Sequence, residues 1–97
     1  TFTGEVYINK NDPHYLELLK EAQARYPNKA GHMQWPHVAP KYMGGPSNGK
    51  LIQLDAAYHQ MITNEFRSKH PFGIGPLDDN VRRRIMQEVY MKYPLPQ

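Results

Sequence analysis

The stretch HVAPKYMGG (residues 37–45), followed by LDAAYHQMITNEFR (residues 54–67), decides the expected fold. The first segment lies within residues 31–43, which hold no helical period and include Pro36 and Pro40, so we predict an extended chain there. The second segment has apolar residues at three- and four-residue steps, which predicts a helix that Asp55 caps and Pro71 ends. Between them, GGPSNG (residues 44–49) is a dense turn signal, and Leu51, Ile52 and Leu54 predict a short apolar strand or turn. The sequence therefore predicts an extended hairpin followed by a helix.

Side chains of an extended segment alternate between its two sides. One side is expected to carry Met33, Trp35, His37 and Ala39, and the other His32, Gln34 and Val38. We expect Trp35 to belong to the core, because a single aromatic residue in a hairpin is more often packed than presented to a ligand.

The flanking sequence predicts one weak strand and two more helices. Residues 1–11 alternate weakly, which is typical of an edge strand, and a junction to a larger parent protein would also lie there. Asp12 and Pro13 together start a helix that stops before Pro27. After the loop PFGIGPL (residues 71–77), Asp78 or Asp79 starts a C-terminal helix over 78–93. We expect residues 1–97 to form a single α+β domain, with the chemistry in 29–76.

Composition excludes several classes of protein. A chain of 97 residues is one domain's length, and no apolar run approaches the roughly 18 residues of a membrane span. No secretory signal pattern opens the chain. Cysteine is absent, which excludes a disulfide scaffold and a thiolate zinc site. The net charge of +3 is compatible with a polyanionic partner.

Two histidines are placed to form a hydrolytic metal site. His59, on the predicted helix, can bind a divalent cation that polarises a phosphoryl oxygen and stabilises the leaving alkoxide. His37, on the hairpin, can take a proton from the attacking water, and Asn48 after the tight turn can hold His37 in its reactive orientation. Thr63 lies one helical turn from His59, where it can touch the water shell of the metal. The alternative is that these residues have only structural roles.

Basic residues offer candidate phosphate contacts. Lys41 stands beside the predicted base and Arg67 is on the same helix as His59, so either can neutralise a phosphate. Arg82, Arg83 and Arg84 span most of a helix circumference and cannot all face one ligand, so we expect a solvated helix face there, with a phosphate clamp as the alternative.

These residues resemble the HNH/endonuclease VII superfamily. The string HxxPKYxGG, then Asn48, then LDAAYHQxITNEFR resembles the small GHH/HHH nuclease domains at the C-termini of Rhs, other polymorphic toxins and type VI secretion effectors. The resemblance covers residues 29–76. It implies a ββα-metal (His-Me finger) core with flanking helices, in which His37 is the general base, His59 a metal ligand and Asn48 the residue that orients the base.

The sequence departs from this family at Pro36, where a second metal-binding histidine usually precedes the base. Three interpretations stay open. His59 and water alone hold the metal; His32 or Gln34 substitutes for the missing ligand; or the domain is weakened or inactive. With no cysteine, Mg²⁺ or Mn²⁺ is the expected ion, with Zn²⁺ or Ni²⁺ as alternatives.

The leading hypothesis is a metal-dependent endonuclease, acting on DNA with RNA not excluded, that serves as an antibacterial toxin. The alternative is a catalytically weakened or inactive module of the same fold that binds DNA or protein. The resemblance implies a larger secreted parent protein N-terminal to Thr1, delivery without its own signal peptide, and action in the target-cell cytoplasm. It also implies a cognate immunity protein, expected to be acidic to suit the net charge of +3.

Overall fold

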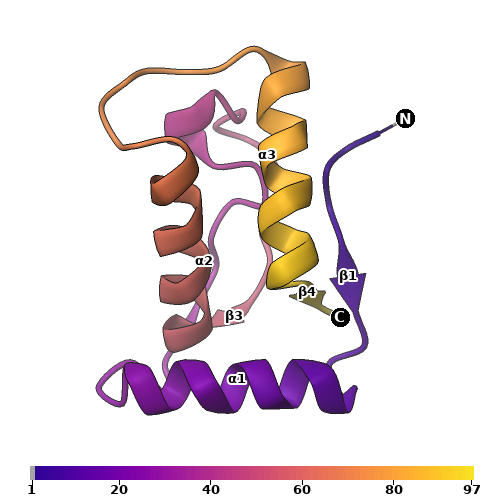
Figure 1. The fold of residues 1–97 in the computed structure, drawn as a ribbon, viewed down its shortest axis with the longest axis vertical. Helices are drawn as coiled ribbons and strands as arrows, with labels where there is room; N and C mark the ends of the chain where they lie inside the picture. The colour runs from indigo at the N-terminus through magenta and orange to yellow at the C-terminus, as the bar shows by residue number, and fades with distance from the viewer. Residues whose placement is uncertain (1) are drawn as a thin grey trace.

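The computed structural model describes residues 2–97 and has an α+β architecture of three helices and two small sheets. The helices are α1 (Pro13–Arg25), α2 (Ala56–Lys69) and α3 (Asp79–Lys92), with a short 3-10 helix, η1 (Lys41–Met43). The strands are β1 (Tyr7–Ile8), β2 (Met33–Gln34), β3 (Leu54–Asp55) and β4 (Leu95–Pro96). In Figure 1, α2 and α3 stand side by side and α1 crosses beneath their lower ends.

An aspartate caps each helix, as the sequence predicts. The carboxylates of Asp12, Asp55 and Asp78 accept hydrogen bonds from backbone N–H groups of the first turns of α1, α2 and α3. Prolines follow the helix ends closely at Pro27, Pro71 and Pro94, so the predicted stops are also confirmed. None of the helices described within residues 2–97 is long and apolar enough to cross a membrane.

The predicted hairpin forms and leads directly into α2. β2 and β3 pair antiparallel, with Gln34 opposite Leu54, and a further bridge pairs His37 with Leu51. The connecting turn is tight at its glycine pair. Gly44 has a φ of 96°, and a Cβ on Gly45 would lie 2.1 Å from the carbonyl oxygen of Ala39. No other residue type fits this turn without shifting the backbone.

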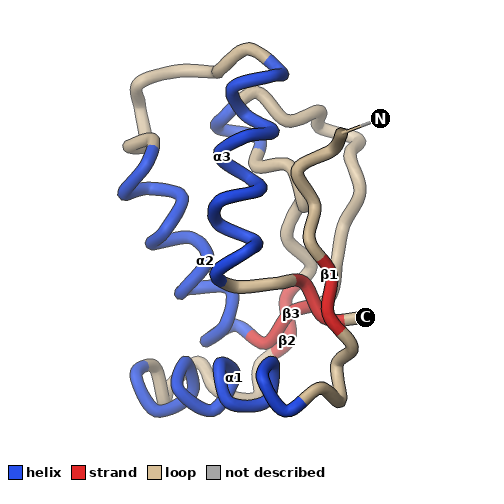
Figure 2. Tube along the Cα trace, turned by 45° about the vertical axis from the view of Figure 1, so that its right-hand side comes forward, coloured by secondary structure: helices blue, strands red, loops and turns tan. Residues whose placement is uncertain are grey.

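The two ends of the chain meet in the second sheet. β1 runs parallel to β4, with Tyr7 opposite Leu95, and the N–H of Leu95 donates to the carbonyl of Val6 at 2.8 Å. Figure 2 shows the four strands gathered on one side of α1. The strand expected within residues 1–11 is therefore confirmed. β4 was not predicted, because two residues after Pro94 carry no strand pattern of their own and pair only once β1 is in place.

The core lies between α2, α3 and the hairpin. Its aromatic rings meet edge to face: Phe66 and Tyr90 at 5.5 Å between centroids, and Tyr15 and Tyr58 at 5.2 Å. The fully buried side chains include Met43 and Val38 from the hairpin side, Met86 and Val89 from α3, and Leu95 from β4. The hairpin is thereby held against both long helices.

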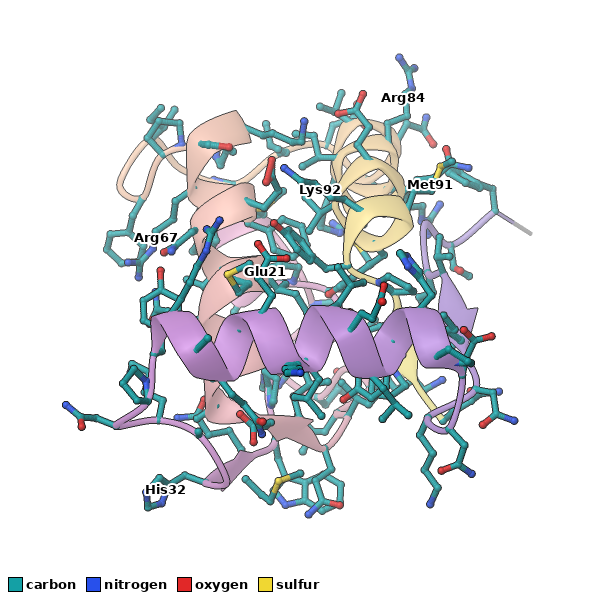
Figure 3. The ribbon with its side chains drawn as sticks, turned by 60° about the horizontal axis from the view of Figure 1, so that its bottom comes forward. Glu21, His32, Arg67, Arg84, Met91 and Lys92 are labelled. Carbon is teal, nitrogen blue, oxygen red and sulfur yellow. The ribbon has the colours of Figure 1, made fainter. Side chains whose placement is uncertain are left out.

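Two expectations about burial are wrong. Trp35 is 60 % exposed, because β2 ends at Gln34 and the Trp35–Pro36 pair turns the side chain outward before pairing resumes at His37. Arg82 is buried instead of solvated: its guanidinium donates to the carbonyl of Gly44 at 3.1 Å and to Asp79 at 2.8 Å. Arg84 is exposed and points into solvent (Figure 3), as expected for that face.

Candidate active site

A cleft of about 470 Å³ runs between the hairpin and one face of α2. Its walls come from both halves of the predicted motif, so residues from 34 to 42 face residues from 56 to 67 across it. The predicted site residues that line the cleft are Gln34, His37, Lys41, His59, Thr63 and Arg67, together with Pro36. The hairpin-then-helix order therefore brings most of the expected constellation to one place.

His59 is oriented by a neighbour on β2. Its Nδ1 lies 2.6 Å from the Oε1 of Gln34, and because a carbonyl oxygen only accepts, Nδ1 carries the proton. The lone pair of the neutral imidazole is then on Nε2. Burial, with the charge of Lys29 adding to it, lowers the pKa of His59 below its ordinary value of 6.5. At neutral pH the ring is thus an uncharged imidazole with one free nitrogen.

His37 has the opposite tautomer. Its Nε2 lies 3.0 Å from the backbone carbonyl of Ser47, so Nε2 carries the proton and the lone pair is on Nδ1. The backbone around it is held by the bridge to Leu51 and by the N–H of Val38, which donates to the carbonyl of Lys50 at 2.9 Å. The hydrogen bond to Ser47 and the pairing with the opposite strand together fix the orientation of the ring.

The charges around the cleft are of one sign. Lys29, Lys41 and Arg67 line it, and no carboxylate is among its lining residues within 2–97. Two acidic residues, Asp55 and Glu65, are next to lining residues in the sequence, and both have other partners. Asp55 caps α2 and accepts from the N–H of Gly31 at 2.7 Å, and Glu65 forms an ion pair with Lys92 at 3.1 Å. Such a cleft attracts an anion, because its lining residues within 2–97 include positive side chains and no negative side chain that would repel the anion.

Two predicted site residues lie outside the cleft. His32 is exposed and points away from α2 at the outer edge of the molecule (Figure 3). Asn48 is exposed, and within residues 2–97 its side chain makes no hydrogen bond; the carbonyl that holds His37 belongs to the preceding residue, Ser47. A metal-binding role for His32 and an orienting role for Asn48 stay predictions.

The expected alternation along the hairpin is wrong at the cleft. Gln34 and His37 were expected on opposite sides, yet both line the cleft. The cause is the interruption at Trp35 and Pro36, where regular pairing stops between β2 and the bridge at His37. A proline lacks the N–H needed for a regular ladder, so the strand loses its two-residue period there.

Sequence reasoning missed several lining residues. Lys29 lies in the turn after α1, Gln60 is on α2 beside His59, and Tyr42 and Phe72 close the far end of the cleft. Lys29 and Phe72 carry no local signal, because only the packing of α1 and of the loop after α2 brings them to the cleft. Gln60 has one available signal, which is its position next to the predicted helix ligand.

The cleft offers few side-chain donors for a metal ion. Within residues 2–97 no three His, Asp or Glu side chains gather as a closed metal cage. The cleft offers the free Nε2 of His59, the hydroxyl of Thr63 and the amide of Gln60. One imidazole with neutral oxygen donors is not the closed four-ligand set of a structural zinc site, and the expected binding of Mg²⁺ or Mn²⁺ stays a prediction.

Comparisons with known protein families, with curated proteins and with solved structures find no match to this chain.

Proposed function

We propose that this chain is a metal-dependent endonuclease that hydrolyses phosphodiester bonds, with DNA as the expected substrate. One observation carries the proposal. His37 with its free Nδ1 and His59 with its free Nε2 line one cationic cleft, and no carboxylate is among the lining residues within 2–97. A general base, a candidate cation ligand and basic side chains for a phosphate are the groups that phosphodiester hydrolysis requires.

His37 is the proposed general base. The attacking water gives its proton to Nδ1, while the Ser47 carbonyl accepts from Nε2–H and favours the imidazolium that forms. Lys41 and Arg67 bind the non-bridging oxygens of the phosphate and keep the scissile bond within reach of the water. His37 and Lys41 lie between β2 and β3 while Arg67 is on α2, so the cleft holds the reacting groups only when the hairpin and α2 are packed together.

His59 is the proposed metal ligand, through Nε2. Gln34 holds the ring by its Nδ1–H, so it acts as a positioning residue for that ligand. Thr63 and water would be the remaining donors, and a bound ion would supply Lewis-acid stabilisation of negative charge on the phosphate. Under this proposal the hairpin and α2 together form a ββα-metal core, and Pro36 is tolerated because one imidazole is sufficient.

The test is cleavage of supercoiled plasmid by the purified domain with Mn²⁺ or Mg²⁺. The wild type should nick and linearise the plasmid, EDTA should stop the reaction, and His37→Ala and His59→Ala should each lose at least ~100-fold in rate. His14→Ala, an exposed histidine on α1, is the matched control and should cleave like the wild type. Intact plasmid with the folded wild type, or equal cleavage by His37→Ala, refutes the proposal.

Pro36 favours a second candidate function, a module of the same fold that binds DNA or protein without cutting. Pro36 lines the cleft beside His37 and offers no metal donor. This candidate predicts that Mn²⁺ gives no binding heat in calorimetry. A binding heat that disappears in His59→Ala rules it out.

The toxin context is part of the same proposal. A nuclease of this kind would be the tip of a larger secreted protein, would act in the cytoplasm of a target cell, and would be neutralised by an acidic immunity protein. The cationic cleft offers one surface for such an inhibitor, because acidic groups would complement its lysines and arginine.

A further inference from the structure

The end of the cleft opposite β2 carries an exposed aromatic side chain. Phe72 is 71 % exposed yet lines the cleft, in the loop of residues 71–77 that connects α2 to α3. Figure 1 shows this loop extending outward beyond the end of α2. This large apolar ring is therefore not part of the hydrophobic core, and it is open to water at the edge of a cationic cleft.

The ring of Phe72 packs against a second aromatic ring. Its centroid lies 5.6 Å from that of Tyr42 in η1, and Tyr42 in turn stacks on the buried His70 at 5.9 Å with an interplanar angle of 27°. The hydroxyl of Tyr42 donates to the His70 carbonyl at 2.9 Å, and His70 Nε2 donates to the Gly75 carbonyl at 2.7 Å. The loop is therefore tied back at both sides of Phe72.

The guanidinium of Arg67 lies over this ring. The guanidinium carbon of Arg67 lies 5.8 Å from the Phe72 centroid. Arg67 is two helical turns after His59 on α2, a rise of about 12 Å along the cleft. An aromatic face next to a phosphate-binding arginine is the arrangement by which proteins hold single-stranded nucleic acid, since the ring stacks a base and the cation neutralises the backbone.

We propose that Phe72, supported by Tyr42, stacks an unpaired base of the substrate strand while Arg67 binds an adjacent phosphate. The inference rests on the proposed nuclease function and adds its substrate class: single-stranded or locally unpaired nucleic acid. A base within a duplex is already stacked on both faces, so it cannot use this platform. Duplex binding depends on the lysines and arginine alone.

Binding is measured by fluorescence anisotropy in EDTA, where no cleavage occurs, with a labelled oligothymidine and a labelled duplex. Phe72→Ala should weaken binding of the single strand by about 5- to 150-fold and leave duplex binding within twofold. Phe72→Tyr, which keeps the ring, should restore the affinity. Ile74→Ala is the matched control: Ile74 is 66 % exposed in the same loop but does not line the cleft, so its loss should change neither affinity.

The two proposals fail separately. If Phe72→Ala binds single strands like the wild type, or loses single-strand and duplex affinity equally, the base-stacking inference is wrong even where plasmid cleavage requires His37. If Phe72→Ala behaves as expected but no variant or wild-type protein cleaves with Mn²⁺, the stacking platform stands and the nuclease proposal fails. Oligodeoxyuridine and oligouridine, which carry the same base, show which sugar the platform accepts, and a loss of affinity of Phe72→Ala in either arm supports the inference.

Discussion

Asp55 connects the helix that carries His59 to the rest of the molecule, and its replacement tests whether tertiary bonds hold the site. One oxygen caps α2 by accepting from the N–H of Ala57 at 2.9 Å. The other accepts from the N–H of Gly31 at 2.7 Å and from the side-chain amide of Gln23 at 3.2 Å. Asp12 provides the comparison, because it caps α1 through the N–H of His14 at 2.8 Å and makes no such tertiary bonds.

Asparagine separates the two roles of Asp55. It caps helices as well as aspartate does, so the helix start itself is retained. Whichever way the amide turns, however, its NH₂ group faces either Gly31 or Ala57, and the N–H on that side loses its acceptor. Hydrogen bonds to charged groups are worth about 1.5–3 kcal/mol, so Asp55→Asn should lose about 2–3 kcal/mol of unfolding free energy. Asp12→Asn should lose less than about 0.5 kcal/mol.

Urea denaturation followed by circular dichroism measures both variants. With a slope of roughly 1–2 kcal/mol per molar for a domain of this size, the Asp55→Asn midpoint should fall by about 1–3 M while Asp12→Asn stays near the wild type. The loss is a large part of the roughly 5–15 kcal/mol that holds a domain folded. Equal midpoints for the two variants would refute the reasoning, since both would then be helix caps and nothing more.

Three further predictions concern the site and its support. Gln34→Ala should weaken Mn²⁺ binding about 10- to 100-fold in calorimetry because the ring of His59 loses its Nδ1 partner, whereas Gln53→Ala, exposed and outside the cleft, should leave it unchanged. The pKa of His59 is lowered below 6.5 in the folded state, so as the pH falls the unfolded chain takes up this proton before the folded chain does. The stability present above pH 6.5 is therefore lost as the pH falls through the folded-state pKa of His59. The urea midpoint of His59→Gln should decline less steeply with acid than that of the wild type. Arg82→Ala should lose about 2 kcal/mol of unfolding free energy in urea denaturation, because it removes the buried hydrogen bond to the Gly44 carbonyl. Arg84→Ala, at an exposed position, should stay within about 0.5 kcal/mol of the wild type. Equal losses for the two variants would show that the bond to Gly44 does not stabilise the fold.

Interactions within one turn of chain explain why the helices could be predicted. Asp12, Asp55 and Asp78 cap the N–H groups two or three residues ahead, and the prolines act on the residues just before them. The close approach of Gly45 to Ala39 likewise belongs to one short turn. These features need no distant partner, so their pattern is complete in the local sequence.

The location of His37 and His59 in one cleft was also predictable in outline. A hairpin that leads straight into a helix leaves few ways to place the two segments, and the apolar residues of α2 set which side faces inward. The tautomers were not predictable. They depend on the Ser47 carbonyl and the Gln34 amide, whose positions follow from the packed turn and from the interruption at Pro36.

The sequence by itself determined the helices, their caps, the hairpin turn and the two histidines that define the candidate site. Only the tertiary structure decided the strand β4, the burial of Arg82, the exposure of Trp35, and the arrival of Lys29 and Phe72 at the cleft. The physical reason is the range of the interactions. Caps and turns act between near neighbours, whereas burial and cleft geometry depend on contacts between segments tens of residues apart, which form only when the whole chain is packed.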